Sequence, residues 1–254
     1  MEGYAGHWTG VPDARPSCEN EKAVAFPGVL TIKSYIEFAD NSMKDSPVRG
    51  FLHTPKAEPG GGLVLTHGAG SDCRSPLLVA LAEEFCAAGW LVLRCDLPFR
   101  QARPHGPPPR GSAERDQAGL RAAIAAMRRH TATRVYLGGH SYGGRQASML
   151  AAAEPGVADA LLLLSYPLHP PQRPEVMRTA HLPDLLVPSL FVHGSQDGFG
   201  SIPEMETAIH LIPMRTELIA VPDAGHELIT RKNRGDVAQM IVKVFLTYTH
   251  DLPS

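Results

Sequence analysis

The chain has 254 residues, a length that fits one large α/β domain or two small ones. Hydrophobic residues make up 43% of it and charged residues 20%, which is the balance of a globular protein with a sizeable core. The formal net charge is −2 and the basic residues are scattered along the sequence. We therefore expect no nucleic acid and no anionic membrane surface as a partner.

The N-terminus, the cysteines and the histidines bear on location and on metal binding. The first residues lack a basic segment followed by an apolar run, and the longest apolar stretch, 158–164, is too short to span a bilayer. The four cysteines show no CxxC spacing and predict free, mostly buried thiols. The twelve histidines show no HxH or HExxH spacing. We expect a cytoplasmic protein with no metal and no organic cofactor.

Residues 1–28 are polar, carry scattered Gly, Pro and Asp, and show no periodicity. This pattern predicts an extended N-terminal arm, followed by a single domain over residues 29–254. Residues 31–38 alternate between apolar and polar in the manner of a half-exposed strand. Residues 48–53 predict its antiparallel partner.

From there on, short apolar runs alternate with helical patterns. The runs predict strands buried on both faces of a sheet, at 63–65, 91–93, 135–137, 161–164 and 190–192, with a further strand-like segment at 217–221. Apolar residues spaced three and four apart predict helices around 78–85, 120–127 and 237–245, and another helix is expected over 145–153. This alternation predicts an α/β fold in which helices cover both faces of a mostly parallel central sheet.

A candidate nucleophile lies between the strand at 135–137 and the helix at 145–153. Residues 139–143 read Gly-His-Ser-Tyr-Gly and match the pattern G-x-S-x-G. In that context the pattern predicts a sharp turn that presents Ser141 to substrate, with small residues needed two positions before and after it. The same letters also fit a plain glycine-rich turn of a doubly wound fold. The strand and the helix favour the catalytic interpretation.

A serine nucleophile in this fold needs an acid and then a histidine further along the chain. Asp197 follows the strand at 190–192 and a glycine turn, and His226 follows the strand-like segment at 217–221. Both would therefore lie at the same sheet edge as Ser141, with His226 as base and Asp197 as its orienting acid. Asp223 is the rival acid, but three positions before His226 it is better placed to form a turn.

The buried strand at 63–65 runs into Thr-His-Gly-Ala-Gly at 66–70. Its glycines allow the backbone to approach Ser141, so the N–H groups of Ala69 and Tyr142 are expected to form an oxyanion hole. We expect His67 to brace this loop and not to act as a base. Cys73 lies on no strand-to-helix turn and is expected to have no catalytic role.

Five motifs together resemble a small α/β-hydrolase family. They are His-Gly-Ala-Gly with a following Ser-Pro, Gly-His-Ser-Tyr-Gly-Gly-Arg, Tyr-Pro-Leu-His-Pro-Pro, Arg-Thr-Ala-His-Leu-Pro and His-Gly-Ser-Gln-Asp, at 67–76, 139–145, 166–171, 178–183 and 193–197. The family is the bacterial dienelactone-hydrolase-like group, related to the hydrolase-like domain of NSL-complex subunit 3 and testis-expressed proteins. The resemblance covers roughly residues 45–250 and implies an α/β-hydrolase fold with hydrolase-like activity.

In that family the turn that carries the nucleophile usually reads Gly-Lys-Ser-Met-Gly-Gly. His140 and Tyr142 differ from this pattern, and their side chains are expected beside the pocket. Dienelactone hydrolase itself has a cysteine where this chain has Ser141. The resemblance therefore does not carry a substrate to this protein.

The pocket is expected to be partly covered, because residues 165–188 are too few for the large helical cap domain that many relatives carry. Together with 100–110 they predict a partial lid. His169, Arg178 and His181, all in residues 165–188, are candidates to face the pocket and to favour a carboxylate on the substrate. A packing or surface role fits the three equally well.

These observations predict a serine hydrolase that cleaves a small or medium acyl ester through an acyl-enzyme. A thioesterase or peptidase with the same triad is an alternative, because the three residues serve esters, thioesters and amides alike. A non-catalytic interaction domain is another, although a scaffold has no chemical need for all three residues. The substrate and the oligomeric state stay open.

Overall fold

The computed structural model describes residues 35–252, and its strands form one sheet in the order β1-β2-β4-β3-β5-β6-β7-β8. Strand β2 pairs antiparallel with both β1 and β4, and every other neighbouring pair is parallel. The strands are β1 Tyr35–Asp40, β2 Val48–His53, β3 Gly62–Thr66, β4 Leu91–Cys95, β5 Val135–His140, β6 Leu161–Leu164, β7 Ser189–Gly194 and β8 Thr216–Val221.

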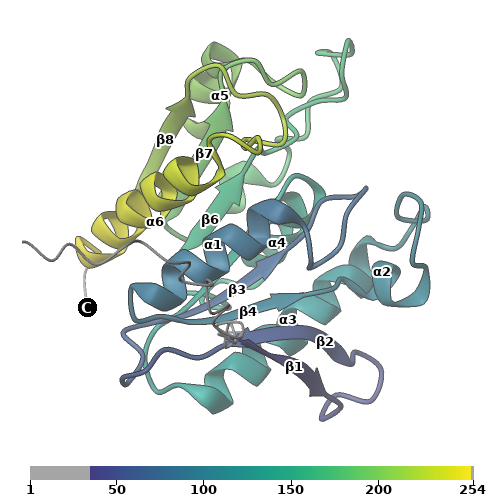
Figure 1. Ribbon diagram of the computed structural model, residues 1–254. Helices are drawn as coiled ribbons and strands as arrows, with labels where there is room; N and C mark the ends of the chain where they lie inside the picture. Colours follow the sequence, from purple (N-terminus) through teal and green to yellow (C-terminus); the bar gives the residue numbers. More distant parts are fainter. Residues whose placement is uncertain (1–34, 253–254) are drawn as a thin grey trace, which may run out of the picture. The chain divides into compact units, whose positions relative to one another are not determined.

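Helices cover both faces of this sheet (Figure 1). They are α1 Pro76–Ala87, α2 Pro98–Ala102, α3 Ala113–His130, α4 Tyr142–Ala153, α5 Ile202–Ile209, α6 Arg234–His250 and the short 3-10 helix η1 Leu182–Asp184. Helices α1 and α6 pack on one face, where their apolar stripes meet the side chains of β3, β5 and β6. Helices α3 and α4 pack on the other face over a second apolar cluster.

The central strands are apolar along their whole length because both of their faces are covered. Every residue of β3, β4, β5, β6 and β7 is buried. In β6 successive leucines divide between the two layers: Leu161 and Leu163 belong to the α3/α4 cluster, whereas Leu162 and Leu164 belong to the α1/α6 cluster. This alternation is the period-2 geometry of a strand.

The structure confirms the predicted sheet, its central strands and the antiparallel pairing of the first two strands, in which Tyr35 faces His53. Of the predicted first strand, residues 31–34 lie outside the described part, and β1 continues to Asp40. The N-terminal arm predicted over 1–28 also lies outside it. The short helices α2 and α5 were not predicted, because five and eight residues give too few turns for a clear apolar stripe.

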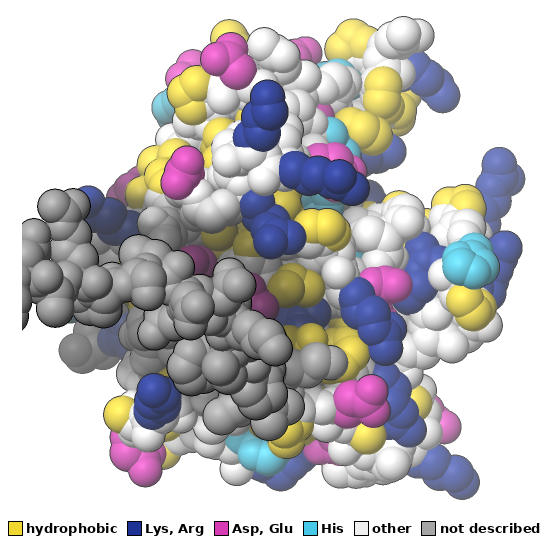
Figure 2. Space-filling model, viewed as in Figure 1, with side chains coloured by type: hydrophobic (Ala, Val, Ile, Leu, Met, Phe, Trp, Pro, Cys, Tyr) yellow, Lys and Arg dark blue, Asp and Glu magenta, His cyan; other side chains and the backbone are white. Residues whose placement is uncertain are grey.

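Two further predictions can be compared with the described residues. Within 35–252 no helix is both long and apolar enough to cross a membrane. Cys73, Cys86 and Cys95 are free and buried, as predicted, while Cys18 lies outside the described residues. On the face shown in Figure 2, basic and acidic side chains are interspersed over the described surface.

Candidate active site

Ser141 lies at the turn between β5 and α4 with a backbone φ of 52°, a conformation that few residues other than glycine adopt. The turn is possible because glycines flank it. A Cβ on Gly139 would lie 2.6 Å from the backbone of Gly143, and a Cβ on Gly143 would lie 2.6 Å from the His67 carbonyl oxygen. The Ser141 N–H donates to the Leu164 carbonyl at 2.8 Å, which fixes the turn to β6. The predicted need for small residues at these positions is confirmed.

Hydrogen bonds join Ser141, His226 and Asp197 in series. The His226 Nδ1 lies 2.8 Å from Asp197 Oδ2 and 3.0 Å from Oδ1, and its Nε2 lies 2.8 Å from Ser141 Oγ. With Asp197 ionised, Nδ1–H donates to the carboxylate, so Nε2 accepts the Ser141 hydroxyl proton. The structure thus brings together the three residues that the sequence singled out, from the loops that follow β5, β7 and β8.

Asp197 is held in place as a buried carboxylate, 6% exposed. Burial raises the pKa of Asp197, but hydrogen bonds from the His226 ring and from the Phe199 N–H outweigh this effect, so the pKa lies below its usual value. Asp197 therefore stays ionised at neutral pH and can stabilise an imidazolium on His226.

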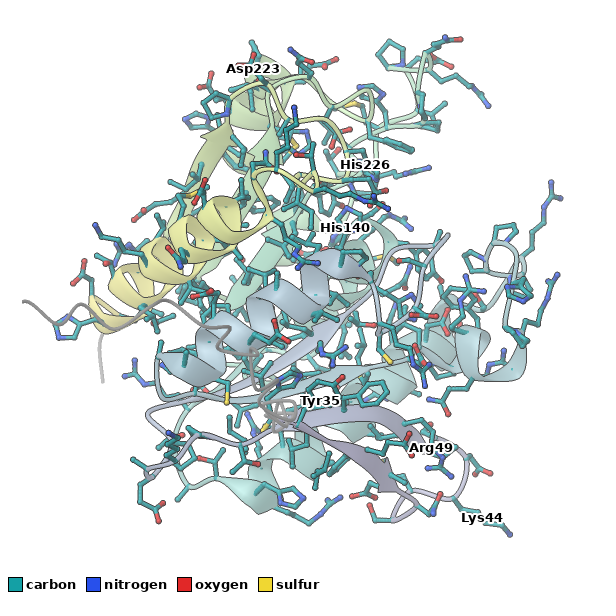
Figure 3. All side chains as sticks on the ribbon, viewed as in Figure 1. Tyr35, Lys44, Arg49, His140, Asp223 and His226 are labelled. Atoms are coloured by element: carbon teal, nitrogen blue, oxygen red, sulfur yellow. The ribbon has the colours of Figure 1, made fainter. Side chains whose placement is uncertain are left out.

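The loops that carry Asp197 and His226 contact each other directly. The Gln196 N–H donates to the Ala224 carbonyl at 2.9 Å, and a Cβ on Gly194 would lie 2.4 Å from the same oxygen. Asp223, the rival acid, is exposed; the Gln196 amide donates to its carboxylate at 3.5 Å. It lies toward the outer end of the loop that carries His226 (Figure 3).

Two aromatic rings enclose the His226 imidazole. Phe199 stacks on it with ring centroids 4.2 Å apart and an interplanar angle of 28°. On another side, His140 Nε2–H donates to the His226 backbone carbonyl at 2.8 Å, and the two side chains lie close together in Figure 3. Burial lowers the pKa of His140, so this ring is neutral. His140 therefore helps to position His226, and it lines a cavity of about 440 Å³ that also borders Ser141 and Ala69.

The predicted oxyanion loop places two free N–H groups beside Ser141. Among the described residues, neither the Ala69 N–H nor the Tyr142 N–H donates a hydrogen bond to the protein. Tyr142 is the first residue of α4, where a backbone N–H has no partner within the helix. Both groups are therefore available to an oxygen bound next to Ser141.

Two side chains brace this loop. His67 Nδ1–H donates to the Gly68 carbonyl at 2.8 Å, and its Nε2 accepts from the Leu97 N–H at 3.1 Å. The bracing role predicted for His67 agrees with this geometry. Arg100, 5% exposed, donates from α2 to the carbonyls of Ala69 and Ser71, both at 2.8 Å. No sequence pattern indicates the contribution from Arg100, because it depends on how α2 folds against the loop.

The side chain of Tyr142 points away from the catalytic groups and into the layer formed by α3. Its hydroxyl donates to Asp116 at 2.8 Å and lies 3.3 Å from the Ser112 hydroxyl. Burial raises the pKa of Tyr142 above its usual range. Asp116 also accepts from the Phe99 N–H at 3.0 Å, so one fully buried carboxylate ties α2 and α3 to the start of α4.

A cavity of about 710 Å³ opens in front of Ser141. The two segments predicted as a partial lid contribute to its wall, through Pro107 and Pro108 on one side and residues from 167 to 181 on the other. Between β6 and β7 the described chain forms only the short helix η1, so no large cap domain is inserted there.

The predicted pocket residues do not all reach this cavity. Arg178 and His181 line it, whereas His169 does not. The His169 ring is buried, donates from Nδ1 to the Pro170 carbonyl at 2.8 Å, and directs Nε2 toward Glu204, 3.6 Å away. Of the two roles left open for His169, the geometry fits the packing role, because the chain turns at Pro170 and carries the ring toward α5. Arg145, which was not among the predicted pocket residues, lines the cavity one helical turn after Ser141.

Solved structures of low sequence identity share this fold. Dienelactone hydrolase from Anabaena variabilis is 23% identical, with a TM-score of 0.64 over 85% of this chain and 99% of that one. Est1E from Butyrivibrio proteoclasticus is 18% identical, with a TM-score of 0.67 over 86% and 100%. An α/β serine hydrolase without lid from Xanthomonas campestris is 16% identical, with a TM-score of 0.66 over 89% and 100%.

The family model described as alpha/beta hydrolase domain matches residues 60–251, which contain the turn at Ser141, both loops of the acid and the base, and the loop at Ala69. The narrower resemblance to the group of NSL-complex subunit 3 stays a prediction. The match spans most of the sequence and agrees with the sheet order and the flanking helices. The chain therefore belongs to the alpha/beta hydrolase domain family.

Proposed function

We propose that this protein is a carboxylic-ester hydrolase that acts on a small or medium acyl substrate through a covalent acyl-enzyme. The observation that carries the proposal is the unbroken series of hydrogen bonds from Ser141 through His226 to Asp197, at the edge of a cavity. A serine hydroxyl is a weak nucleophile on its own, and a base within hydrogen-bond distance is what activates it.

The reaction begins with the substrate carbonyl oxygen between the N–H groups of Ala69 and Tyr142. Ser141 Oγ attacks the carbonyl carbon while His226 Nε2 takes the hydroxyl proton, and the Asp197 carboxylate stabilises the imidazolium that forms. His226 then donates this proton to the leaving alcohol as the bond to it breaks. A water molecule, deprotonated by His226, attacks the acyl-enzyme and releases the acid. These steps use no metal and no organic cofactor.

Replacing the nucleophile tests the proposal. For Ser141→Ala we expect turnover of p-nitrophenyl butyrate to fall by a factor on the order of 10⁴, because the acyl-enzyme can no longer form. A fluorophosphonate should label the wild-type protein at Ser141 and leave the variant unlabelled. The control is Ser42→Ala, which removes an exposed hydroxyl between β1 and β2. It should keep both activity and labelling. Wild-type turnover by a folded Ser141→Ala protein would contradict the proposal.

The type of bond needs a separate measurement, because the same triad serves esters, thioesters and amides. An oxygen ester, a thioester and an amide of one acyl group should be compared by kcat/KM. We expect the oxygen ester to react fastest relative to its uncatalysed hydrolysis. If the thioester or the amide shows the larger acceleration, the protein is a thioesterase or a peptidase. If no bond is cleaved and no serine probe reacts with folded protein, the site is not catalytic.

A further inference from the structure

Two arginines line the cavity in front of Ser141 without any acidic residue beside them. Arg145 comes from α4 and Arg178 from the segment between β6 and β7, and none of the residues lining the cavity is an aspartate or a glutamate. Most of the other lining residues are apolar. Neither arginine forms an ion pair with any described residue of the chain.

Arg145 is close to the reacting centre. Its backbone N–H donates to the Ser141 carbonyl at 3.0 Å, so its Cα lies one helical turn from the nucleophile. Its side-chain Nε is buried and has no hydrogen-bond partner in the protein. A buried donor of this kind costs free energy unless something accepts from it, and a ligand in the cavity is one source of an acceptor.

Hydrogen bonds to its backbone groups fix the position of Arg178. Its N–H donates to the Leu168 carbonyl at 2.8 Å, and its carbonyl accepts from the Tyr166 hydroxyl at 2.7 Å. Of its side-chain nitrogens, Nη1 donates to the Pro167 carbonyl at 3.2 Å. Arg145 and Arg178 line the same cavity, and burial, together with the nearby charge of Arg145, lowers the pKa of Arg178.

His181 does not balance these charges. Ser148 Oγ donates to the Arg145 carbonyl, so the His181 Nε2–H donates to Ser148 Oγ at 2.8 Å. Burial and Arg145 lower the pKa of His181 to about 4, and the ring is therefore neutral at pH 7. The cavity wall thus carries two positive charges and no counter-charge.

We propose that Arg145 and Arg178 bind a carboxylate of the substrate, so that the ester cleaved at Ser141 carries a negative charge on its acyl or alcohol part. This inference rests on the proposed ester hydrolysis and names its substrate class. An anion between two unpaired guanidinium groups gains charge-assisted hydrogen bonds and removes their mutual repulsion, and the planar fork of arginine matches a carboxylate. The apolar remainder of the wall suits the carbon chain that joins the carboxylate to the ester.

Matched pairs of esters test the inference in the intact protein. The first pair is mono-p-nitrophenyl glutarate and its neutral methyl ester, which differ in a charge on the acyl side, with succinate and adipate pairs covering other lengths. The second pair is 4-acetoxybenzoate and its methyl ester, which differ in a charge on the leaving group. We expect kcat/KM for the charged member of one pair to exceed that of its neutral partner by about 10- to 100-fold, mainly through a lower KM.

Substitution of the arginines should remove this preference. In the double variant Arg145→Gln/Arg178→Gln, the ratio of kcat/KM for charged and neutral partners should fall close to one, and each single variant should lower it partly. The matched control is Arg173→Gln, which removes an exposed arginine of the same segment that pairs with Glu175 and does not line the cavity. This control should keep the wild-type ratio. No preference in wild type, or a preference that survives the double variant, overturns the inference.

Binding to the inactive protein separates this inference from the proposed function. In Ser141→Ala protein, monomethyl glutarate should bind about 10-fold or more tightly than dimethyl glutarate by calorimetry, and Arg145→Gln/Arg178→Gln in that background should abolish the difference. This measurement needs no turnover. If the double variant folds poorly, the preference for the charged compound can still be measured without it, by kinetics in wild type and by binding in Ser141→Ala. Esters cleaved at Ser141 with equal binding of both probes would leave the hydrolase intact and refute the carboxylate site.

Discussion

Asp197 and Asp223 show how burial, more than position in the sequence, separates a carboxylate that is bonded to the His226 ring from one at the surface. Both precede His226 on loops at the same edge of the sheet, but only Asp197 is buried and hydrogen-bonded to the His226 ring. Its carboxylate is kept ionised by partners that exist only in the folded chain. Asp223, three residues from His226, has its carboxylate near Gln196 in an exposed turn.

Replacing either carboxylate by its amide gives a direct comparison. Asp197→Asn should lower kcat for an activated ester by roughly 10³- to 10⁴-fold with little change in KM, because an amide cannot stabilise the imidazolium and can hold the wrong tautomer. Asp223→Asn should retain activity close to wild type. Steady-state kinetics of both variants, after circular dichroism has shown them to be folded, make the measurement. The opposite order of effects would exchange the two assignments.

At the scale of elements, the turn from β5 to α4 depends on glycines whose missing side chains leave room for other backbone segments. Gly139 faces the backbone of Gly143 and Gly144, and Gly143 faces the loop at His67. The strand, the helix and the oxyanion loop therefore approach one another more closely than any residue with a Cβ would allow. Hydrogen bonds of Arg100 and His67 hold the loop at Ala69 in place.

A methyl group at the turn should disrupt this contact. In Gly139→Ala the new Cβ would meet backbone atoms at 2.6 Å, and these cannot rotate away as a side chain can. We expect the free energy of unfolding to fall by about 1–3 kcal/mol or more, together with a loss of activity. Gly235→Ala is the control, because its Cβ would meet nothing within 4 Å at the start of α6. Thermal unfolding should show a lower Tm for the first variant and no loss for the second.

At the scale of the whole molecule, several buried histidines are kept neutral by the fold. Burial lowers the pKa of His53 to about 3, with a further contribution from the charge of Arg94, and lowers the pKa of His181 to about 4. The pKa values of His67, His140 and His193 are lowered for the same first reason. The unfolded chain therefore binds more protons than the folded protein once the pH falls below the ordinary histidine pKa of 6.5.

The sign of this linkage predicts a loss of stability in mild acid. The free energy of unfolding should be highest near neutral pH and fall as the pH drops from 6.5 toward 5, above the range in which the shifted carboxylates titrate. In His53→Gln one fewer proton can be taken up on unfolding. The free energy of unfolding should therefore change less steeply with pH, by up to about 1.4 kcal/mol per pH unit. His250→Gln, which replaces a ring that is 89% exposed, should not change it. Urea unfolding at pH 7.5, 6 and 5 makes the comparison, and a slope that is unchanged by His53→Gln would contradict the prediction.

The sequence predicts the parts of this molecule that depend on local pattern. The five central strands, the turn at Ser141 and the loops of Asp197 and His226 carry short signals that do not need distant residues to be recognised. Phe199 and Arg100 carry no such signal, because their roles depend on which segment the fold places beside them. Arg145 could have been predicted to line the pocket, because it lies four residues after Ser141 on a helix and therefore on the same helix face.

The loops that follow β7 and β8 contact each other directly, and this contact holds Asp197 and His226 together. Gly194 packs against the Ala224 carbonyl, Gln196 bonds to the same oxygen, and Phe199 lies flat on His226. Asp197 and His226 are therefore tied to each other by their loops as well as by their own hydrogen bond. His140, the residue before Ser141, bonds to the His226 backbone and links this pair to the turn after β5. We therefore expect the three side chains to keep their relative positions when this edge of the sheet fluctuates.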